Sequence, residues 1–231
     1  MHVANDTFNY LAVLFSIIVG LAATELLQGL RDLLVARQRV VLYWPAVTRV
    51  ATLLLILAQT WWAIFGLRGH LDWTFGMYAV VLLQIVLLYL VTSLALPSVL
   101  PEGEIDMRAL YFAHASAFYL LLVAAAAASI AKDAVIDGRL PDPGNLLFHA
   151  GFIVVALAAA ASRRDWVHKG ATLVIFASFI AVLSVLCELV SPRWKPVFGI
   201  SPLKRQSDAS LQAPLCGAPG MFSCRRGDVP D

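Results

Sequence analysis

The sequence predicts an all-α membrane protein, a polytopic bundle of about six transmembrane helices. Hydrophobic residues make up 60 % of the 231 residues and charged residues only 14 %, against about 45–50 % and about 25 % in soluble domains. The mean hydropathy is +0.79, and several apolar runs reach the roughly 20 residues that a spanning helix needs. This composition excludes a disordered chain and an ordinary soluble enzyme. The net charge of +2 is too small to indicate a nucleic-acid partner.

The first three expected spans carry signals at their ends. The span over 10–30 follows a segment without Lys or Arg and is too long for a signal peptide, so we expect a retained helix. The span over 41–67 has Pro45 in its first turns, where a missing N–H group is tolerated. The span over 73–96 stops at Pro97.

The remaining spans are expected over 107–131, 146–162 and 171–190, and the last is closed by Ser191 and Pro192. The fifth is the shortest. All six runs are too long and too unbroken for β-barrel strands, which alternate apolar and polar residues over about 10 residues. Helices are therefore expected, because lipid offers the backbone no other hydrogen-bonding partners.

The composition changes after the sixth span. We expect a helical bundle over 1–190 and a largely disordered tail over 191–231, which is rich in Pro, Ser, Gly and charged residues. Cys216 and Cys224 lie in this tail. They could form a disulfide in an oxidising compartment and would be free thiols in the cytoplasm. Two cysteines without a nearby histidine make too weak a metal signature, and we expect no metal and no other cofactor.

The orientation follows from the basic residues of the loops. The loops after the first, third and fifth spans hold seven of them: Arg31, Arg37, Arg39, Arg108, Arg163, Arg164 and Lys169. The loops on the opposite side hold three, which are Arg68, Lys132 and Arg139. Four more on that side lie in the tail and make the two totals equal: Arg193, Lys195, Lys204 and Arg205. The first helix then decides the orientation, because no basic residue precedes it and three follow it. We expect both termini outside, which is the periplasmic side in a bacterium.

Ionisable residues within the spans are costly and indicate a packing or functional role. Glu25 lies five residues before the end of the first span, and Arg49 lies five residues after Trp44. Both are therefore about 8 Å below the same interface. A short loop makes the two helices antiparallel neighbours, so an ion pair is expected as part of an interhelical seam. The alternatives are a substrate, ion or proton site that includes Gln28 and Gln59, or two charges that reach water separately.

Two histidines accompany these residues at the ends of later spans. His114 opens the fourth span on the side of Glu25 and Arg49. The three residues could form a proton relay, or His114 could be hydrogen-bonded near the interface. On the opposite side, His149 and Glu188 could form a hydrogen bond, or both could reach water. The two histidines lie at opposite faces and cannot ligate one haem together.

Part of the chain resembles a group of uncharacterised bacterial multi-pass inner-membrane proteins. The residues that carry the resemblance are Phe15-Ser16-Ile17-Ile18-Val19-Gly20-Leu21-Ala22, Thr24, Leu26-Leu27, Gly29-Leu30, Tyr43-Trp44, Gln59, Trp61-Trp62 and Leu96-Pro97. They lie in the first three spans, under half of the chain. The resemblance implies a bacterial inner-membrane location and implies no activity.

No catalytic motif is present: the sequence has no H-E-x-x-H, G-x-S-x-G or G-x-x-x-x-G-K-[ST]. We therefore expect a non-enzymatic membrane protein that is a subunit or partner of a membrane complex. Its expected partners are the lipid bilayer and either a second copy or another membrane protein, with no nucleic acid. The alternative is a small oligomeric transporter or channel with a polar path through Glu25, Arg49 and Gln59. An intramembrane enzyme is the third hypothesis.

Overall fold

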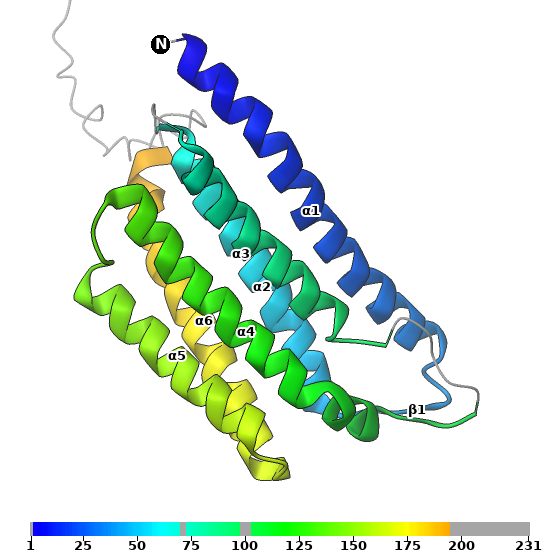
Figure 1. Ribbon diagram of the computed structural model, residues 1–231. Helices are drawn as coiled ribbons and strands as arrows, with labels where there is room; N and C mark the ends of the chain where they lie inside the picture. Colours follow the sequence, from blue (N-terminus) through cyan, green and yellow to red (C-terminus); the bar gives the residue numbers. More distant parts are fainter. Residues whose placement is uncertain (1, 70–72, 98–102, 195–231) are drawn as a thin grey trace, which may run out of the picture. The chain divides into compact units, whose positions relative to one another are not determined.

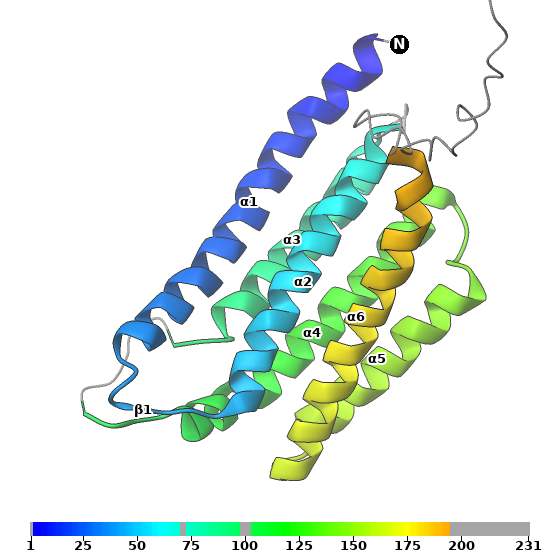
Figure 2. The same cartoon turned by 180° about the vertical axis from the view of Figure 1, so that it is seen from behind.

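The computed structural model describes residues 2–69, 73–97 and 103–194, with side chains over 8–68, 73–97 and 103–184. The described residues hold six α-helices, each long and apolar enough to cross a membrane, which confirms the predicted fold class (Figures 1 and 2). They are α1 (His2–Val35), α2 (Trp44–Gly66), α3 (Phe75–Ser93), α4 (Met107–Asp137), α5 (Pro143–Ala161) and α6 (Asp165–Trp194). A 3-10 turn, η1 (Leu67–Gly69), follows α2.

Polar residues just outside the apolar runs set several helix ends. The Asp106 side chain accepts hydrogen bonds from the first backbone N–H groups of α4, and Asp142 accepts one from Asn145 in α5. Thr74 does the same for α3. Such caps satisfy N–H groups that have no partner within the helix. At the end of α4, Gly138 has φ of +65°, a left-handed conformation that favours glycine and stops the helix.

Consecutive helices run antiparallel within the compact unit Met1–Cys187, so α1 and α3 run in the same direction. Helix α3 lies between α1 and α4, and α4 packs in turn against α5 (Figure 1). Large apolar side chains fill the interior, among them Phe15, Leu53, Val91 and Phe118, each at most 2 % exposed. Many apolar side chains on the other faces of the helices are exposed, as expected of surfaces that meet lipid.

Two short strands join the loops at one end of the bundle. Strand β1 (Val40–Val41) pairs in parallel with β2 (Ile105–Asp106), and Val40 is opposite Ile105. The loop after α1 is thereby fixed to the loop before α4, and the first turns of α2 and α4 lie close together. No pattern in the sequence predicts these strands, because two residues are too few for a periodic pattern.

The predicted tail lies largely outside the described residues. Helix α6 continues to Trp194, and residues 195–231, which include Cys216 and Cys224, are not described. The predicted disorder and the predicted disulfide therefore stay predictions.

Candidate functional site

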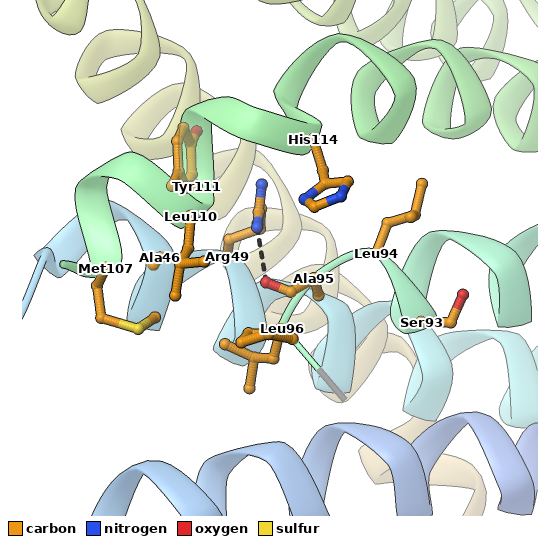
Figure 3. Close-up of a pocket in the computed structure, with 11 residues that line it drawn as sticks. Ala46, Arg49, Ser93, Leu94, Ala95, Leu96, Met107, Leu110, Tyr111 and His114 are labelled. Carbon is orange, nitrogen blue, oxygen red and sulfur yellow. Dashed lines mark hydrogen bonds between the residues drawn. The ribbon is translucent and has the colours of Figure 1, made fainter. Parts of the chain in front are cut away.

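Arg49 is the most deeply buried charged residue among the described side chains. It lies in the second turn of α2 and is 6 % exposed. Its guanidinium group packs against the rings of Tyr111 and Phe118 in α4, with Cζ 4.3 Å from each ring centre. Its Nη2 atom donates a hydrogen bond of 2.6 Å to the Ala95 carbonyl oxygen (Figure 3). Aromatic rings and one carbonyl group thus surround this cation.

The guanidinium group lacks an acidic partner. None of the ion pairs within the described residues involves Arg49. The Nε and Nη1 atoms of Arg49 are buried and have no hydrogen-bond partner. An arginine side chain stays protonated, so this charge cannot be removed by loss of a proton. Each cation–π contact contributes up to about 2 kcal/mol, against several kcal/mol for burying the charge. Arg49 is therefore only partly stabilised by its surroundings.

A cavity of about 310 Å³ lies beside Arg49. The first turns of α2 and α4 and the end of α3 form its walls. Figure 3 shows Arg49 in the middle of these residues, with Tyr111 and His114 on one side of it and Leu96 on the other. The walls also include Met107 and Leu110. The site is thus a cavity with several apolar walls, a few polar groups and one permanent cation.

A second, much smaller space lies on the bundle side of Arg49. Its volume is about 20 Å³, which is enough for one water molecule. Arg49, Thr52, Tyr119 and Thr172 contribute polar groups to its lining. Leu53, Ile56, Phe118, Leu122 and Ile175 make the rest of its lining apolar, so Arg49 lies between the cavity and a small, mostly apolar space beside the middle of α2.

A buried network of side chains adjoins Arg49. The Tyr111 hydroxyl group is 2.8 Å from the Tyr119 hydroxyl group and 3.3 Å from Nδ1 of His168. Nε2 of His168 lies 2.8 Å from the Ser162 carbonyl oxygen, which only accepts. Nε2 therefore carries the proton, and Nδ1 accepts the hydrogen bond from Tyr111. This network fixes the Tyr111 ring against the arginine.

A cluster of charges lies at the same end of the bundle. The Tyr43 hydroxyl group donates a hydrogen bond of 2.7 Å to Asp165, which also pairs with Arg108 at 3.3 Å and with Lys169. Burial, helped by the bond to Asp165, raises the pKa of Tyr43. Asp165 thus pairs with two cations, and Arg49 is a third cation at this end of the bundle. The local charge therefore favours an anion.

The structure does not bring Glu25 and Arg49 together. Helix α1 packs chiefly against α3, and the Glu25 carboxylate lies beside the hydroxyl group of Tyr89, close enough to interact with it. Arg49 faces α4 instead. Both residues lie near the expected interface, but the rotation of each helix about its axis directs them to different neighbours.

The other predicted residues are distributed over the bundle. His114 is exposed and shares the cavity with Arg49. Gln28 is exposed, and Gln59 is half-buried with its Oε1 atom unpaired. His149 Nδ1 is 2.9 Å from the backbone oxygen of Asn145.

For two site predictions, the structure describes only part of the residues concerned. The side chain of Glu188, the predicted partner of His149, lies outside them. No group of three or more His, Cys, Asp or Glu residues that could hold a metal ion occurs in the described part of the chain.

His168 and Tyr111 were missed as site residues. His168 precedes the predicted start of the sixth span at 171 and therefore falls outside every predicted span. Helix α6 begins earlier, at Asp165, and His168 is fully buried. The pattern Asp165, Trp166 and Lys169 ahead of an apolar run would have indicated a helical first turn.

Comparison with known proteins finds no matching family model, no matching curated protein and no matching solved structure. The chain is a multi-pass membrane protein with six candidate spans. The resemblance to bacterial inner-membrane proteins stays a prediction.

Proposed function

We propose that the protein is a non-enzymatic membrane protein that binds a ligand through a negatively charged group at Arg49. The observation that carries this proposal is the buried guanidinium group without a carboxylate partner beside a cavity of about 310 Å³. A bound anion would compensate the buried charge and use the cavity. Arginine suits this role, because its planar group binds carboxylates and phosphates by charge-assisted hydrogen bonds.

The charges around the site support an anionic ligand. Arg108 and Lys169 share the carboxylate of Asp165, so this end of the bundle carries excess positive charge. Basic residues in the loops at the same end add to the field, which raises the local concentration of anions. His114 at the cavity supplies a further polar group for a ligand.

Transport of the anion is the second candidate function. One observation favours it: a small, mostly apolar space that Thr52, Tyr119 and Thr172 also line extends from Arg49 toward the middle of the helices. A path of this kind would lead past Arg49 without Glu25, which faces Tyr89. Loss of anion flux into liposomes in both Thr52→Val and Thr172→Val variants, with binding at Arg49 unchanged, would support transport over binding alone.

The binding proposal is tested with the purified full chain in detergent. Thermal unfolding is measured with acetate, inorganic phosphate and octanoate, each against chloride at equal ionic strength. An anion at about 100 times its Kd stabilises a folded protein by about 2.7 kcal/mol. We expect at least one of these anions to stabilise the wild type, and the effect to be lost in Arg49→Gln.

Arg68→Gln is the matched control. Arg68 also packs on an aromatic ring, with Cζ 4.3 Å from the Phe65 ring centre, but it is exposed at the other end of α2. Anions should stabilise the Arg68→Gln variant as much as they stabilise the wild type. Circular dichroism and gel filtration establish that both variants fold. Equal stabilisation of the wild type and a folded Arg49→Gln variant, or no stabilisation of either, would refute the proposal.

We place the protein in a bacterial inner membrane, with both termini in the periplasm and Arg49 near the cytoplasmic side. The loop charges and the first helix support this orientation. The test uses a variant in which Cys216 is the one remaining cysteine, because Cys187 and Cys224 are replaced by Ser. After reduction, Cys216 should react with an impermeant thiol reagent in intact cells. Labelling only after cell lysis would show that the termini lie in the cytoplasm, which is the opposite orientation.

A further inference from the structure

We infer that the ligand is a single-chain monocarboxylate, with its carboxylate at Arg49 and its apolar chain along the cavity wall. This inference rests on the proposed function and names its ligand class. It follows from the charge, the lining, the volume and the depth of the cavity.

The charge of the cavity fits one negative charge. Arg49 is the one permanently charged side chain among the described residues that line it. A carboxylate would match this single cation, whereas a phosphate dianion would leave one charge uncompensated in an apolar setting. Nη2 of Arg49 donates to the carbonyl oxygen of Ala95. Nε and Nη1 have no partner but are buried, so the guanidinium group has to turn toward the cavity for these two donors to bind the carboxylate.

The lining favours a ligand with an apolar body. Leu94, Leu96, Met107 and Leu110 contribute aliphatic walls next to the arginine (Figure 3). A small hydrated anion would lose its water here and meet hydrocarbon in exchange. An aliphatic chain gains from the same contacts, and each buried methylene group strengthens binding about fourfold.

The volume and the depth of the cavity agree with a ligand that has a single alkyl chain. A cavity of about 310 Å³ is near the lower limit of small-molecule sites, which span roughly 300–1,000 Å³. It exceeds what acetate needs and is small for a lipid with two acyl chains. Arg49 is five residues beyond Trp44, about 8 Å along the helix. Interfacial amphipathic helices bury their apolar face to a similar depth, about 5–10 Å into the boundary between headgroups and acyl chains, so an apolar chain beside Arg49 is at a depth that suits hydrocarbon.

A chain-length series tests the inference on the purified full chain. Calorimetric titrations use acetate, butanoate, hexanoate and octanoate, with 1-octanol as the uncharged counterpart of octanoate and inorganic phosphate as the anion without a chain. The Arg49→Gln variant corrects for partition into detergent. We expect the Arg49-dependent affinity to rise about fourfold per methylene group. Octanol and phosphate should bind at least tenfold more weakly than octanoate.

Two substitutions on α4 test where the apolar chain of the ligand lies. Leu110→Trp fills the cavity and leaves Arg49 in place, so it should weaken octanoate at least tenfold and acetate much less. The matched control is Leu120→Trp, because Leu120 is 54 % exposed on the same helix and lies outside the cavity lining. It should change neither affinity.

The outcomes separate this inference from the proposed function. If acetate or phosphate binds as tightly as octanoate through Arg49, the apolar chain contributes nothing, and the inference fails while anion binding stands. The same holds if vesicles of phosphatidylglycerol compete for Arg49 and octanoate does not. If none of the anions depends on Arg49, the proposed function fails as well.

Discussion

Arg49 joins the second helix to the end of the third, because its Nη2 atom donates a hydrogen bond of 2.6 Å to the Ala95 carbonyl oxygen. Ala95 directly follows Leu94, the C-cap of α3. The last carbonyl groups of a helix lack partners within it, and the negative end of the helix dipole favours a cation there. This contact explains part of the position of Arg49. It leaves Nε and Nη1 without partners, and the proposed ligand accounts for these two donors.

Replacing Arg49 by Met should raise the stability of the ligand-free protein by about 1 kcal/mol, because an apolar side chain of similar length replaces an unpaired buried charge. The lost bond to Ala95 and the lost ring contacts limit the gain. Reversible unfolding in detergent measures it. Arg68→Met, at an exposed arginine that also packs on a ring, should change stability by less than about 0.5 kcal/mol. A clear loss of stability in Arg49→Met would show that Arg49 acts mainly as a structural contact.

Tyr111→Phe should lower stability and leave anion binding intact. The substitution removes the hydroxyl group that contacts both Tyr119 and His168, and unpaired buried polar groups cost about 1–3 kcal/mol. The ring that packs on Arg49 remains. Unfolding and octanoate titration measure the two effects separately.

A tyrosine outside this network serves as the control for Tyr111→Phe. Tyr78 stacks on Phe15 with ring centres 5.4 Å apart, so Tyr78→Phe keeps its main contact and should be nearly neutral. Loss of octanoate binding in Tyr111→Phe would mean that the hydroxyl group belongs to the binding site.

The helices could be predicted from the sequence because lipid enforces them. An apolar run of sufficient length has no other way to satisfy its backbone groups, so all six were found. The predicted start of the fourth span at 107 matches α4. The start of the fifth was predicted less accurately, because Asp142 begins α5 by capping it rather than by being apolar. The early start of α6 at Asp165 is the clearest case.

The site could be predicted only in its parts. Arg49 and His114 were identified as polar residues at one end of the bundle, and the cavity contains both. The expected partner Glu25 faces Tyr89 instead. Depth in the membrane follows from counting residues, but rotation about the helix axis depends on the packing of several helices at once. The strand pair β1 and β2, which brings the first turns of α2 and α4 together, left no periodic signal.

Gly29→Ala should destabilise the packing of α1 against the end of α3. A Cβ atom at Gly29 would lie 2.8 Å from Cδ1 and 3.0 Å from Cβ of Leu96. Overpacking of this kind costs about 1–3 kcal/mol, because the Leu96 Cβ atom cannot move without its backbone. Thermal unfolding measures the loss.

Gly20→Ala is the control on the same helix. Nothing lies within 4 Å of a Cβ atom there, and alanine favours the helix over glycine by up to about 1 kcal/mol. This variant should therefore be neutral or more stable. If both variants behave alike, the close approach of α1 and Leu96 does not contribute to stability.

Tyr43→Phe should change the stability of the protein at high pH. Burial and the hydrogen bond to Asp165 raise the pKa of Tyr43 above its usual range, so the folded protein holds this proton more tightly than the unfolded chain. The stabilisation is complete below about pH 10, the ordinary tyrosine pKa, and is lost as pH rises from there toward the folded pKa. At most, the unfolding equilibrium changes about tenfold per pH unit.

The measurement is the unfolding of both proteins between pH 7 and pH 11. At pH 7, Tyr43→Phe should be less stable by about 0.5–1.5 kcal/mol, because it lacks the bond to Asp165. Above pH 10 the wild type should lose stability more steeply, and the difference between the two proteins should shrink. The comparison isolates Tyr43, because every other tyrosine is present in both. Parallel curves up to pH 11 would show that Tyr43 is not held in its protonated form by the fold.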